Sequence, residues 1–522
     1  MRKFTVTGTC IPRKNYMVDI TGKLKQIKAM IDAEEYFTIN RGRQYGKTTT
    51  LLALEKFLSD EYTVISISFE GFDEEEFANV KEFCQRFLGI VYDALILTSE
   101  PREYCEKWKN TGVSSFDDLG RHIAAMSRDK KLVLMIDEVD KVSNNRVFLG
   151  FLSKLREKFL ARNAEKDFTF HSVILAGVYD IRNIKLRLIQ EGLLTPKAGE
   201  TAIHNSPWNI AADFDVNMSF SASEIETMLE EYEKDYQIGM NISEIANEIY
   251  NYTGGYPVLV SRICKHIDEK LDKRWDSQGI RQAIKLLLKE NSPLFQSLIK
   301  NLGSNQDLSD MIYDILMLGG RWSFTFTNPI VGLGHRYGYF VNVNDRVRIS
   351  NKIFEMQITN YFVSKEQLAN LKIGVPASVH NEIIQNDKFN MQVCLEKFAK
   401  YYLQHFSKKD GKFIEREGRF FFLFFLNSLL NGRGFAHAES AFTDDKRMDV
   451  VVNYLDQQFI VELKIWYGEK RHENAFKQLL GYMDKMSLNE GYLLTFDFRK
   501  KKELKQEWTS VSGGKKIFSI IV

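Results

Sequence analysis

Cysteine, proline and a one-sided charge are all scarce in this sequence. Its 522 residues include 5 cysteines and 8 prolines, and 71 basic residues nearly balance 69 acidic ones, which leaves a formal net charge of +2. The cysteines are odd in number, widely scattered and form no C-x-x-C pair or zinc-type spacing, which favours a reducing cytoplasm. The balanced charge excludes a polybasic binder, so any surface for nucleic acid must be local.

Long apolar runs are also lacking. The most hydrophobic run, Phe420 to Leu426, is far shorter than the roughly 20 residues of a membrane span. The segment Met1 to Cys10 has no apolar core, so we expect no secretory signal and no membrane partner. What remains is a globular composition, with 44% hydrophobic and 27% charged residues. At roughly 150 residues per domain, the length predicts about three or four domains.

The first motif is R-G-R-Q-Y-G-K-T at 41–48, between a β-like run at 38–40 and a helical pattern at 49–58. Strand, loop, Gly-Lys-Thr and helix form the context of a P-loop, in which backbone N–H groups and a lysine hold phosphates and a hydroxyl ligates Mg²⁺. Arg41 stands where the full pattern has its first glycine, and a chance Gly-Lys-Thr before a helix is the alternative. The residues predicted to bind ATP are Gly42, Gly46, Lys47, Thr48 and Thr49.

A second motif follows about 90 residues later. Leu132 to Ile136 is a continuous apolar run, typical of a buried parallel strand, and it ends in Asp137-Glu138. As a Walker B motif it predicts that Asp137 holds Mg²⁺ and that Glu138 orients or deprotonates the attacking water. The alternative is a buried strand before a solvated acidic loop that includes Asp140.

Further β-like runs at 62–69 and 172–176 are separated by helical patterns at 79–97 and 148–162. This alternation predicts a parallel sheet covered on both faces. The turn after Ala176 contains Asp180 and Arg182. They are either a sensor segment beside the γ-phosphate or part of an ordinary loop.

The P-loop segment resembles that of AAA-ATPase-like proteins related to the archaeal and STAND ATPases. The resemblance extends to Tyr16 to Ile20, L-M-I-D-E-V-D, G-V-Y-D-I-R-N and the T-G-G-Y-P turn at 253–257. In such relatives the first P-loop glycine is often replaced. The resemblance implies that the T-G-G-Y-P turn follows a helical lid and approaches the adenine. It also implies a second sensor at Arg262, for which a solvated helix arginine is the alternative.

The middle of the chain is predicted to be helical from Ser221 to Lys273, as a lid, and from Asp307 to Leu318. An alternating run at 340–349, with a turn at Asn344-Asp345, predicts a hairpin and hence a winged helix. A DNA-binding role would use Arg321, Arg336, Arg346 and Arg348. We favour a structural spacer or switch instead, because these basic residues are few and form no continuous patch.

The C-terminal third contains a second catalytic pattern after a predicted helical connector, 365–403. Glu417 opens an apolar helix through Leu430, and strands are predicted at 434–441, 447–452 and 458–465. Because alternate residues of a strand share a face, Glu462 and Lys464 project together, with Asp449 across from them on the neighbouring strand. The predicted ligands of Mg²⁺ or Mn²⁺ are Asp449, Glu462 and the Leu463 carbonyl, with a further carboxylate from Glu417. Lys464 would orient or deprotonate the attacking water.

This D-x12-E-x-K pattern, with Gln478 and Tyr482 one helical turn apart, resembles the PD-(D/E)xK nuclease superfamily. Met448 replaces the usual proline, a common variation. A surface strand with solvated charges is the alternative, and His437 and His472 are interpreted as ordinary polar positions. An AAA-ATPase-like domain joined to such a nuclease is similar to a known bacterial architecture.

The fold class expected is therefore α/β and multidomain. We expect a P-loop ATPase core with a parallel sheet at 1–220, a helical lid at 221–277, a winged helix at 278–363, a helical connector at 364–400 and a restriction-endonuclease-like domain at 401–522. The functional hypothesis is an ATPase that gates Mg²⁺-dependent cleavage of nucleic acid, DNA in preference to RNA, in a homo-oligomer and in defence or mobile-element processing. The alternative is a non-cleaving ATP switch, and a chaperone-like or transport ATPase is a third option.

Overall fold

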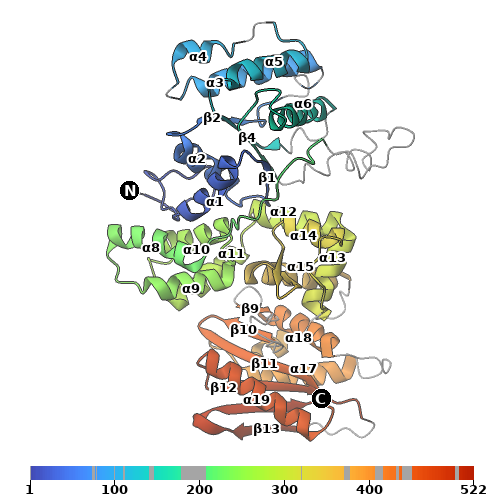
Figure 1. Cartoon of the computed structure of the whole chain (residues 1–522). Coiled ribbons are helices and arrows are strands. Elements are labelled where there is room, and N and C mark those ends of the chain that lie inside the picture. The colour runs from blue at the N-terminus through green and yellow to red at the C-terminus, as the bar shows by residue number, and fades with distance from the viewer. Residues whose placement is uncertain are drawn as a thin grey trace, which may run out of the picture. The chain divides into compact units, whose positions relative to one another are not determined.

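The computed structural model describes residues 2–72, 77, 79–98, 100–109, 112–139, 146–177, 207–318, 320–369, 377–405, 415–430, 434–437, 450–499 and 505–522 (Figure 1). Asp140, Asp180, Arg182 and Asp449 lie outside these residues. The chain forms two compact units. The first consists of 1–246, 255–261 and 336–338, and the second of the remaining residues.

The first unit is built on a sheet of four parallel strands in the order β1-β4-β3-β2, which confirms the predicted parallel sheet. Its strands are β1 (Tyr36–Asn40), β2 (Thr63–Ser68), β3 (Leu132–Asp137) and β4 (Ser172–Gly177). All six residues of β3 are buried, as its continuous apolar run predicts. This sheet places the end of β3 at Asp137 on the same edge as the loop that follows β1.

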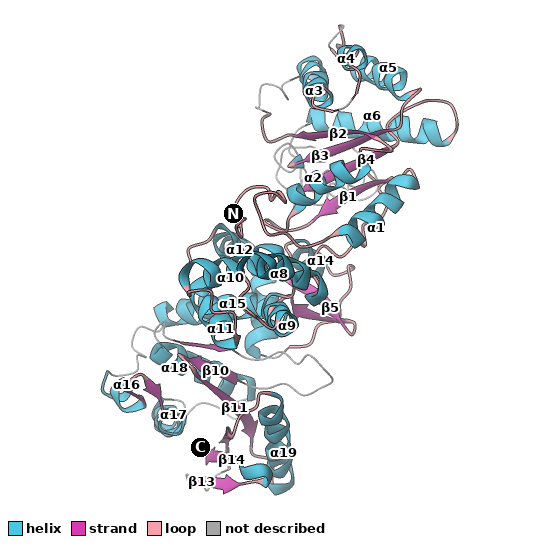
Figure 2. Ribbon diagram, turned by 90° about the vertical axis from the view of Figure 1, so that its left-hand side faces the viewer, coloured by secondary structure: helices cyan, strands magenta, loops and turns pink. Residues whose placement is uncertain are grey.

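Helices cover both faces of this sheet (Figure 2). One face, including Phe37, Val133 and Ile174, packs against α1 (Thr21–Asp32) and α2 (Lys47–Leu58). The other face, including Ile65 and Leu134, packs against α3 (Val80–Leu95), α5 (Phe116–Ser127) and α6 (Arg146–Asn163). The short α4 (Arg102–Glu106) lies beside α3. Alternate residues of each strand thus pack into two apolar cores, one on each face of the sheet. The loops at the strand ends, including the one after β1, lie outside these cores.

The middle of the chain is helical, as predicted. It contains α8 (Ala222–Tyr236), α9 (Ile242–Thr253), α10 (Pro257–Lys270), α11 (Ser277–Leu288), α12 (Pro293–Ser304), α13 (Gln306–Tyr313), a π-helical turn (Asp314–Leu318), α14 (Pro329–Arg336) and α15 (Lys352–Ala369). Between α14 and α15, β5 (Phe340–Val343) and β6 (Arg346–Ile349) form the predicted hairpin. Asn344 and Asp345 have φ of 52° and 58°, as a two-residue turn of the primed kind requires. The winged helix itself stays a prediction.

The connector differs from the uninterrupted helical pattern expected over 365–403. After α15, the described residues form α16 (Ala377–Ile383), a two-strand hairpin of β7 (Ile384–Gln385) and β8 (Lys388–Phe389), and α17 (Met391–His405). Asn386 and Asp387 adopt φ of 51° and 59° at the turn. Because Asn and Asp tolerate this left-handed conformation, they break the helical pattern here.

The C-terminal sheet has six strands in the order β13-β14-β12-β11-β10-β9. They are β9 (Gly434–His437), β10 (Val450–Tyr454), β11 (Gln457–Ile465), β12 (Glu490–Phe496), β13 (Lys505–Ser510) and β14 (Lys516–Ile521). β9, β10 and β11 are antiparallel, whereas β11, β12 and β14 run parallel. This confirms the predicted α/β fold of the C-terminal domain.

Helices lie on both faces of the C-terminal sheet. Val461 and Leu463 pack with α17 and α18 (Glu415–Leu430), and Ile460 and Leu493 pack with α19 (Glu469–Lys485). The apolar run at 420–426 belongs to α18, and its residues 422–426 are buried. In the part of the chain that is described, no helix is both long and apolar enough to cross a bilayer.

Gly255 in the T-G-G-Y-P turn offers a test of this packing. Its φ is 71°, and a Cβ there would lie 1.8 Å from the carbonyl oxygen of Phe220. We expect Gly255→Ala to destabilise the protein by about 3 kcal/mol or more, because backbone strain and a clash with backbone add. Gly239→Ala is the matched control, since Gly239 also has a positive φ, 78°, but a Cβ on Gly239 would meet nothing within 4 Å.

The control should lose only about 1 kcal/mol, through conformational strain. Thermal denaturation of both variants and the wild type measures the difference. Equal losses in the two variants would contradict the close approach of Phe220.

Candidate functional site

The loop after β1 has the backbone of a phosphate-binding loop. Gln44 and Gly46 have φ of 58° and 80°, and Lys47 is the first residue of α2. The Lys47 side chain is buried, and its Nζ donates hydrogen bonds to the carbonyl oxygens of Arg41 (3.0 Å) and Gly42 (3.2 Å). The loop therefore closes around the lysine ammonium at the N-terminus of a helix, where phosphate oxygens are favoured.

Thr48 and Asp137 meet although they come from different elements. The Thr48 hydroxyl at the start of α2 donates to Asp137 Oδ2 at 2.5 Å, across a sheet in which β4 separates β1 from β3. Asp137 is only 7% exposed, and the backbone N–H of Glu138 donates to its Oδ1 at 2.9 Å. Two oxygens this close fit the ligand set of one Mg²⁺. Glu138 follows directly, with a left-handed φ of 55° that non-glycine residues adopt rarely.

Thr49, the last residue of the predicted ATP-binding set, lies in the first turn of α2. Its hydroxyl accepts a hydrogen bond from the backbone N–H of Cys10 at 3.3 Å. This contact joins the N-terminal segment to the P-loop helix. The sequence had not connected these two regions.

Arg41 shows why the first glycine of the motif is dispensable here. It is not among the residues with positive φ, so its backbone does not require glycine. Its guanidinium donates to the carbonyls of Asn40 (2.9 Å) and Val216 (3.2 Å) and lies 5.7 Å from the ring centroid of Phe214. Burial lowers the pKa of this guanidinium. These contacts hold the Arg41 side chain against residues 214–216. It therefore does not occupy the interior of the loop, where the Lys47 side chain lies.

Two tyrosines from distant parts of the chain, Tyr256 and Tyr337, approach the P-loop. A Cβ on Gly42 would lie 2.6 Å from the Tyr337 carbonyl oxygen, so this position requires glycine. The Tyr256 hydroxyl of the T-G-G-Y-P turn donates to the Arg43 carbonyl at 2.7 Å, and its ring packs edge-on against Tyr45 at 4.5 Å. The tyrosine of the T-G-G-Y-P turn was a visible signal for this contact, whereas the sequence had no signal for Tyr337.

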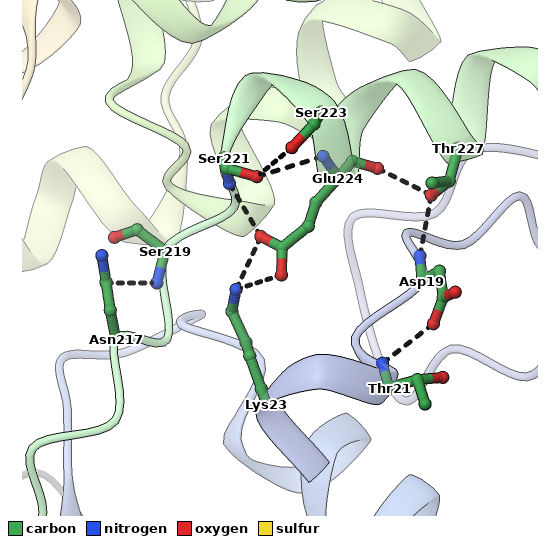
Figure 3. A network of polar contacts seen from close by, with 9 residues as sticks. All are labelled: Asp19, Thr21, Lys23, Asn217, Ser219, Ser221, Ser223, Glu224 and Thr227. Carbon is green, nitrogen blue, oxygen red and sulfur yellow. Dashed lines mark hydrogen bonds and ion pairs between the residues drawn. The ribbon is translucent and has the colours of Figure 1, made fainter. Parts of the chain in front are cut away.

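A polar network ties the first helix of the lid to the N-terminal segment (Figure 3). Ser221 and Glu224 form a capping box at the start of α8, and Lys23 of α1 pairs with Glu224 (Nζ to Oε2, 2.6 Å). The backbone N–H of Asp19 donates to the Thr227 hydroxyl at 2.9 Å. Ser219, just before this helix, lies 2.5 Å from the Tyr45 hydroxyl. The start of α8 is therefore connected to both α1 and the P-loop.

Arg262, the candidate second sensor, is not a solvated residue. Its side chain is 11% exposed and forms an ion pair with Glu290, which also lies 2.9 Å from Nε2 of His266. The role of Arg262 as a sensor stays a prediction.

The second candidate site lies on β11. Glu462 and Lys464 share a face of the sheet with Ile460, the face that α19 covers, whereas Leu463 faces the opposite core. Glu462 is fully buried, and Lys464 Nζ lies 2.8 Å from its Oε1. A carboxylate at this depth costs free energy unless a cation compensates its charge, so the position fits an ammonium or a metal ion.

Gln478 on α19 lies beside the same pair. Its Nε2 donates to the Tyr482 hydroxyl at 3.0 Å, as the predicted one-turn spacing allows. Gln478 and Lys464 both line a cavity of about 260 Å³. The structure thus brings Gln478 of α19 to the pair formed by Glu462 and Lys464 of the preceding strand.

The structure describes less of the surroundings of the other two predicted carboxylates, Glu417 and Asp449. Glu417 lies in the first turn of α18. A Cβ on its neighbour Gly418 would lie 2.4 Å from the ring of Phe496, the residue that pairs with Ile465 beside Lys464. Asp449 lies outside the described residues, directly before Val450, which pairs with Val461 beside Glu462. Among the described residues no group of three or more His, Cys, Asp and Glu could hold a metal, so the ligand set stays a prediction.

Comparison with known proteins identifies two domain families in the chain. The family model of the AAA-like domain matches residues 16–317, and that of the PD-(D/E)XK nuclease superfamily matches residues 435–507. No match to a curated protein is found.

Several solved structures are similar to the chain, and two of them are ATP-related proteins of archaea. A Walker-type ATPase of Pyrococcus abyssi is 12% identical, with a TM-score of 0.45 over 68% of this chain and 99% of its own. The ORC2 protein of Aeropyrum pernix, in ADPNP and ADP complexes, is also 12% identical, with a TM-score of 0.30 over 68% of this chain and 96% of its own.

The two family models explain different parts of the chain. The first includes the P-loop and Asp137, and the second includes Glu462, Lys464 and Gln478. Both matches point to an enzyme. Because the first model spans more than half of the 522 residues, the chain belongs to the AAA-like domain family, and it joins this domain to one of the PD-(D/E)XK nuclease superfamily.

Proposed function

We propose that the chain binds and hydrolyses ATP and that its nucleotide state gates a Mg²⁺-dependent nuclease. The observation that carries the nuclease half is the buried Glu462 with Lys464 at 2.8 Å, beside Gln478, in a domain of a nuclease superfamily. The ATPase half is supported by the contact between Thr48 and Asp137 in the AAA-like domain.

In the ATPase domain, Lys47 binds the β- and γ-phosphate oxygens, together with the backbone of Gly42 and Gly46 and the first turn of α2 through Thr49. Thr48 and Asp137 hold Mg²⁺, which neutralises phosphate charge. Glu138, next to Asp137 at the end of β3, orients the attacking water.

In the nuclease domain, Asp449, Glu462 and the carbonyl of Leu463 hold Mg²⁺, or Mn²⁺ in its place, and Glu417 adds a carboxylate. A metal held there would supply a water of lowered pKa and positive charge beside the phosphate. Lys464 orients that water, and its ammonium offsets negative charge on the phosphodiester. Gln478 positions the strand or the water from the α19 side.

The finer assignments belong to the same proposal. Its nucleic acid is DNA in preference to RNA, several copies of the chain assemble when ATP binds, and the process served is defence or mobile-element processing. Support comes from the pairing of an AAA-like domain with a nuclease domain in one chain. The hairpin region near 340–349 acts as a spacer or switch rather than as the main DNA contact. Mass photometry with and without ATP tests the assembly.

Cleavage of labelled single- and double-stranded DNA and RNA, with Mg²⁺, Mn²⁺ or a chelator, tests the nuclease. We expect cleavage that requires the metal and that falls about 100-fold or more in Asp449→Ala, because a metal ligand is lost. Asp456→Ala is the matched control, since Asp456 is an exposed aspartate at the turn of the same β10–β11 hairpin. Cleavage by Asp449→Ala at the wild-type rate would refute the assignment, and no cleavage by any protein would favour the non-cleaving switch.

A further inference from the structure

The cavity beside Lys464 continues along the chain past the end of β11. Besides Lys464 and Gln478, its walls include Trp466, Tyr467 and His472, and its volume is about 260 Å³. This is close to the roughly 300 Å³ at which ligand pockets begin, and therefore suits one flat group rather than a large molecule. The cavity opens next to the residue to which we assign the attacking water.

Three aromatic rings line this cavity, and one of them is exposed. Trp466 and His472 lie 5.1 Å apart, and Tyr467 is 63% exposed. Neither apolar cluster of the C-terminal sheet includes these three residues. A large exposed ring gains nothing from water, so Tyr467 at the edge of a cavity points to a ligand with an apolar face.

The charges around the cavity fit a nucleotide. The guanidinium of Arg499 lies 4.9 Å from the Trp466 ring centroid and is oriented by Asp497, whose Oδ2 accepts from its Nη2 at 2.6 Å. Lys464 adds a second cation. Burial lowers the pKa of His472, against an opposing effect of Glu507, so its ring is neutral at pH 7 and presents an uncharged face. Cations for a phosphate thus lie beside flat rings for a base.

We propose that this pocket receives one unpaired nucleobase next to the phosphate that is cleaved, stacked on Tyr467. The inference rests on the proposed nuclease, because it requires the strand to pass Lys464. A paired base inside a duplex has both faces covered by its neighbours and cannot enter unless it leaves the stack. The substrate class is therefore single-stranded or locally unpaired nucleic acid.

Binding of a fluorescent single strand, the corresponding duplex and the same strand with abasic sites tests the pocket without requiring cleavage. All proteins carry Glu462→Gln, so that the strands stay intact. We expect Tyr467→Ala to weaken binding of the single strand about tenfold and binding of the duplex less than twofold, the size of effect found for one stacked base. Tyr467→Phe, which keeps the ring, should restore tight binding.

Phe326→Ala is the matched control, because Phe326 is a ring 66% exposed in a segment outside the nuclease match. It should change neither affinity, and the abasic strand should bind equally to the Glu462→Gln protein with and without Tyr467→Ala.

Equal weakening for single strand and duplex, or no weakening, overturns the pocket. If the expected binding pattern appears while the wild type cleaves nothing, the pocket is retained and the nuclease proposal fails. If the wild type cleaves while Tyr467→Ala binds normally, only the pocket fails.

Discussion

Replacing Lys464 by alanine is expected to lower the rate of nucleic-acid cleavage by a factor of about 10² to 10⁴ and to leave ATP hydrolysis unchanged. The reason is local. Lys464 lies 2.8 Å from the buried Glu462 and at the wall of the cavity that Gln478 also lines. The positive charge of its ammonium lies on this face of β11, where it can offset the negative charge of the phosphodiester. Initial rates of cleavage and of phosphate release, measured on the same protein preparation, separate the two activities.

Lys516→Ala is the control for this experiment. Lys516 is an exposed lysine of β14. In the strand register its backbone lies opposite Glu490 at the beginning of β12, whereas that of Lys464 lies opposite Thr495 near the end of β12. The Lys516→Ala protein should cleave at the wild-type rate. Because the loss of Lys464 leaves the charge of Glu462 buried, thermal denaturation of Lys464→Ala must show that the domain is folded. A folded Lys464→Ala protein that cleaves as fast as Lys516→Ala would exclude the assigned role.

The second large effect concerns nucleotide binding. Lys47→Ala should weaken ATP binding at least about tenfold and reduce ATP hydrolysis about 100-fold or more, because the loop loses the ammonium around which the carbonyls of Arg41 and Gly42 are arranged. Titration with a fluorescent ATP analogue and a phosphate-release assay measure the two quantities.

Lys56→Ala provides the comparison within the same helix. Lys56 is exposed in the last turn of α2, so its loss changes the charge of the domain equally but leaves the loop intact. Wild-type ATP binding by Lys47→Ala, or equal losses in both variants, would contradict a P-loop at 41–48.

Local patterns in the sequence predicted the elements that carry both sites. The apolar run before Asp137 predicted a buried parallel strand, and the alternation around Leu463 predicted that Glu462 and Lys464 share a face. Both predictions rest on short-range rules of strand geometry, which hold when a strand is central in its sheet. The role of each site residue stays a prediction, because it depends on ligands and on Asp449.

Long-range contacts were not predictable in the same way. Nothing near Tyr337 indicates that its carbonyl approaches Gly42, nearly 300 residues away, and nothing near Val216 indicates that it accepts from Arg41. The connector was predicted to be helical because its hydrophobic spacing is helical, yet the left-handed turn at Asn386-Asp387 ends the helix. An Asn-Asp pair between two apolar segments was the available signal, and turn chemistry outweighed periodicity there.

In the proposed function, nucleotide state controls cleavage. This coupling is tested by the initial rate of cleavage of one substrate by wild type and Lys47→Ala, each without nucleotide, with ATP and with a non-hydrolysable analogue. We expect the wild-type rate to differ about tenfold between nucleotide states, a typical size for coupling between two sites. Lys47→Ala should cleave at one rate in all three conditions. A wild-type rate that is the same in all three conditions would contradict this coupling.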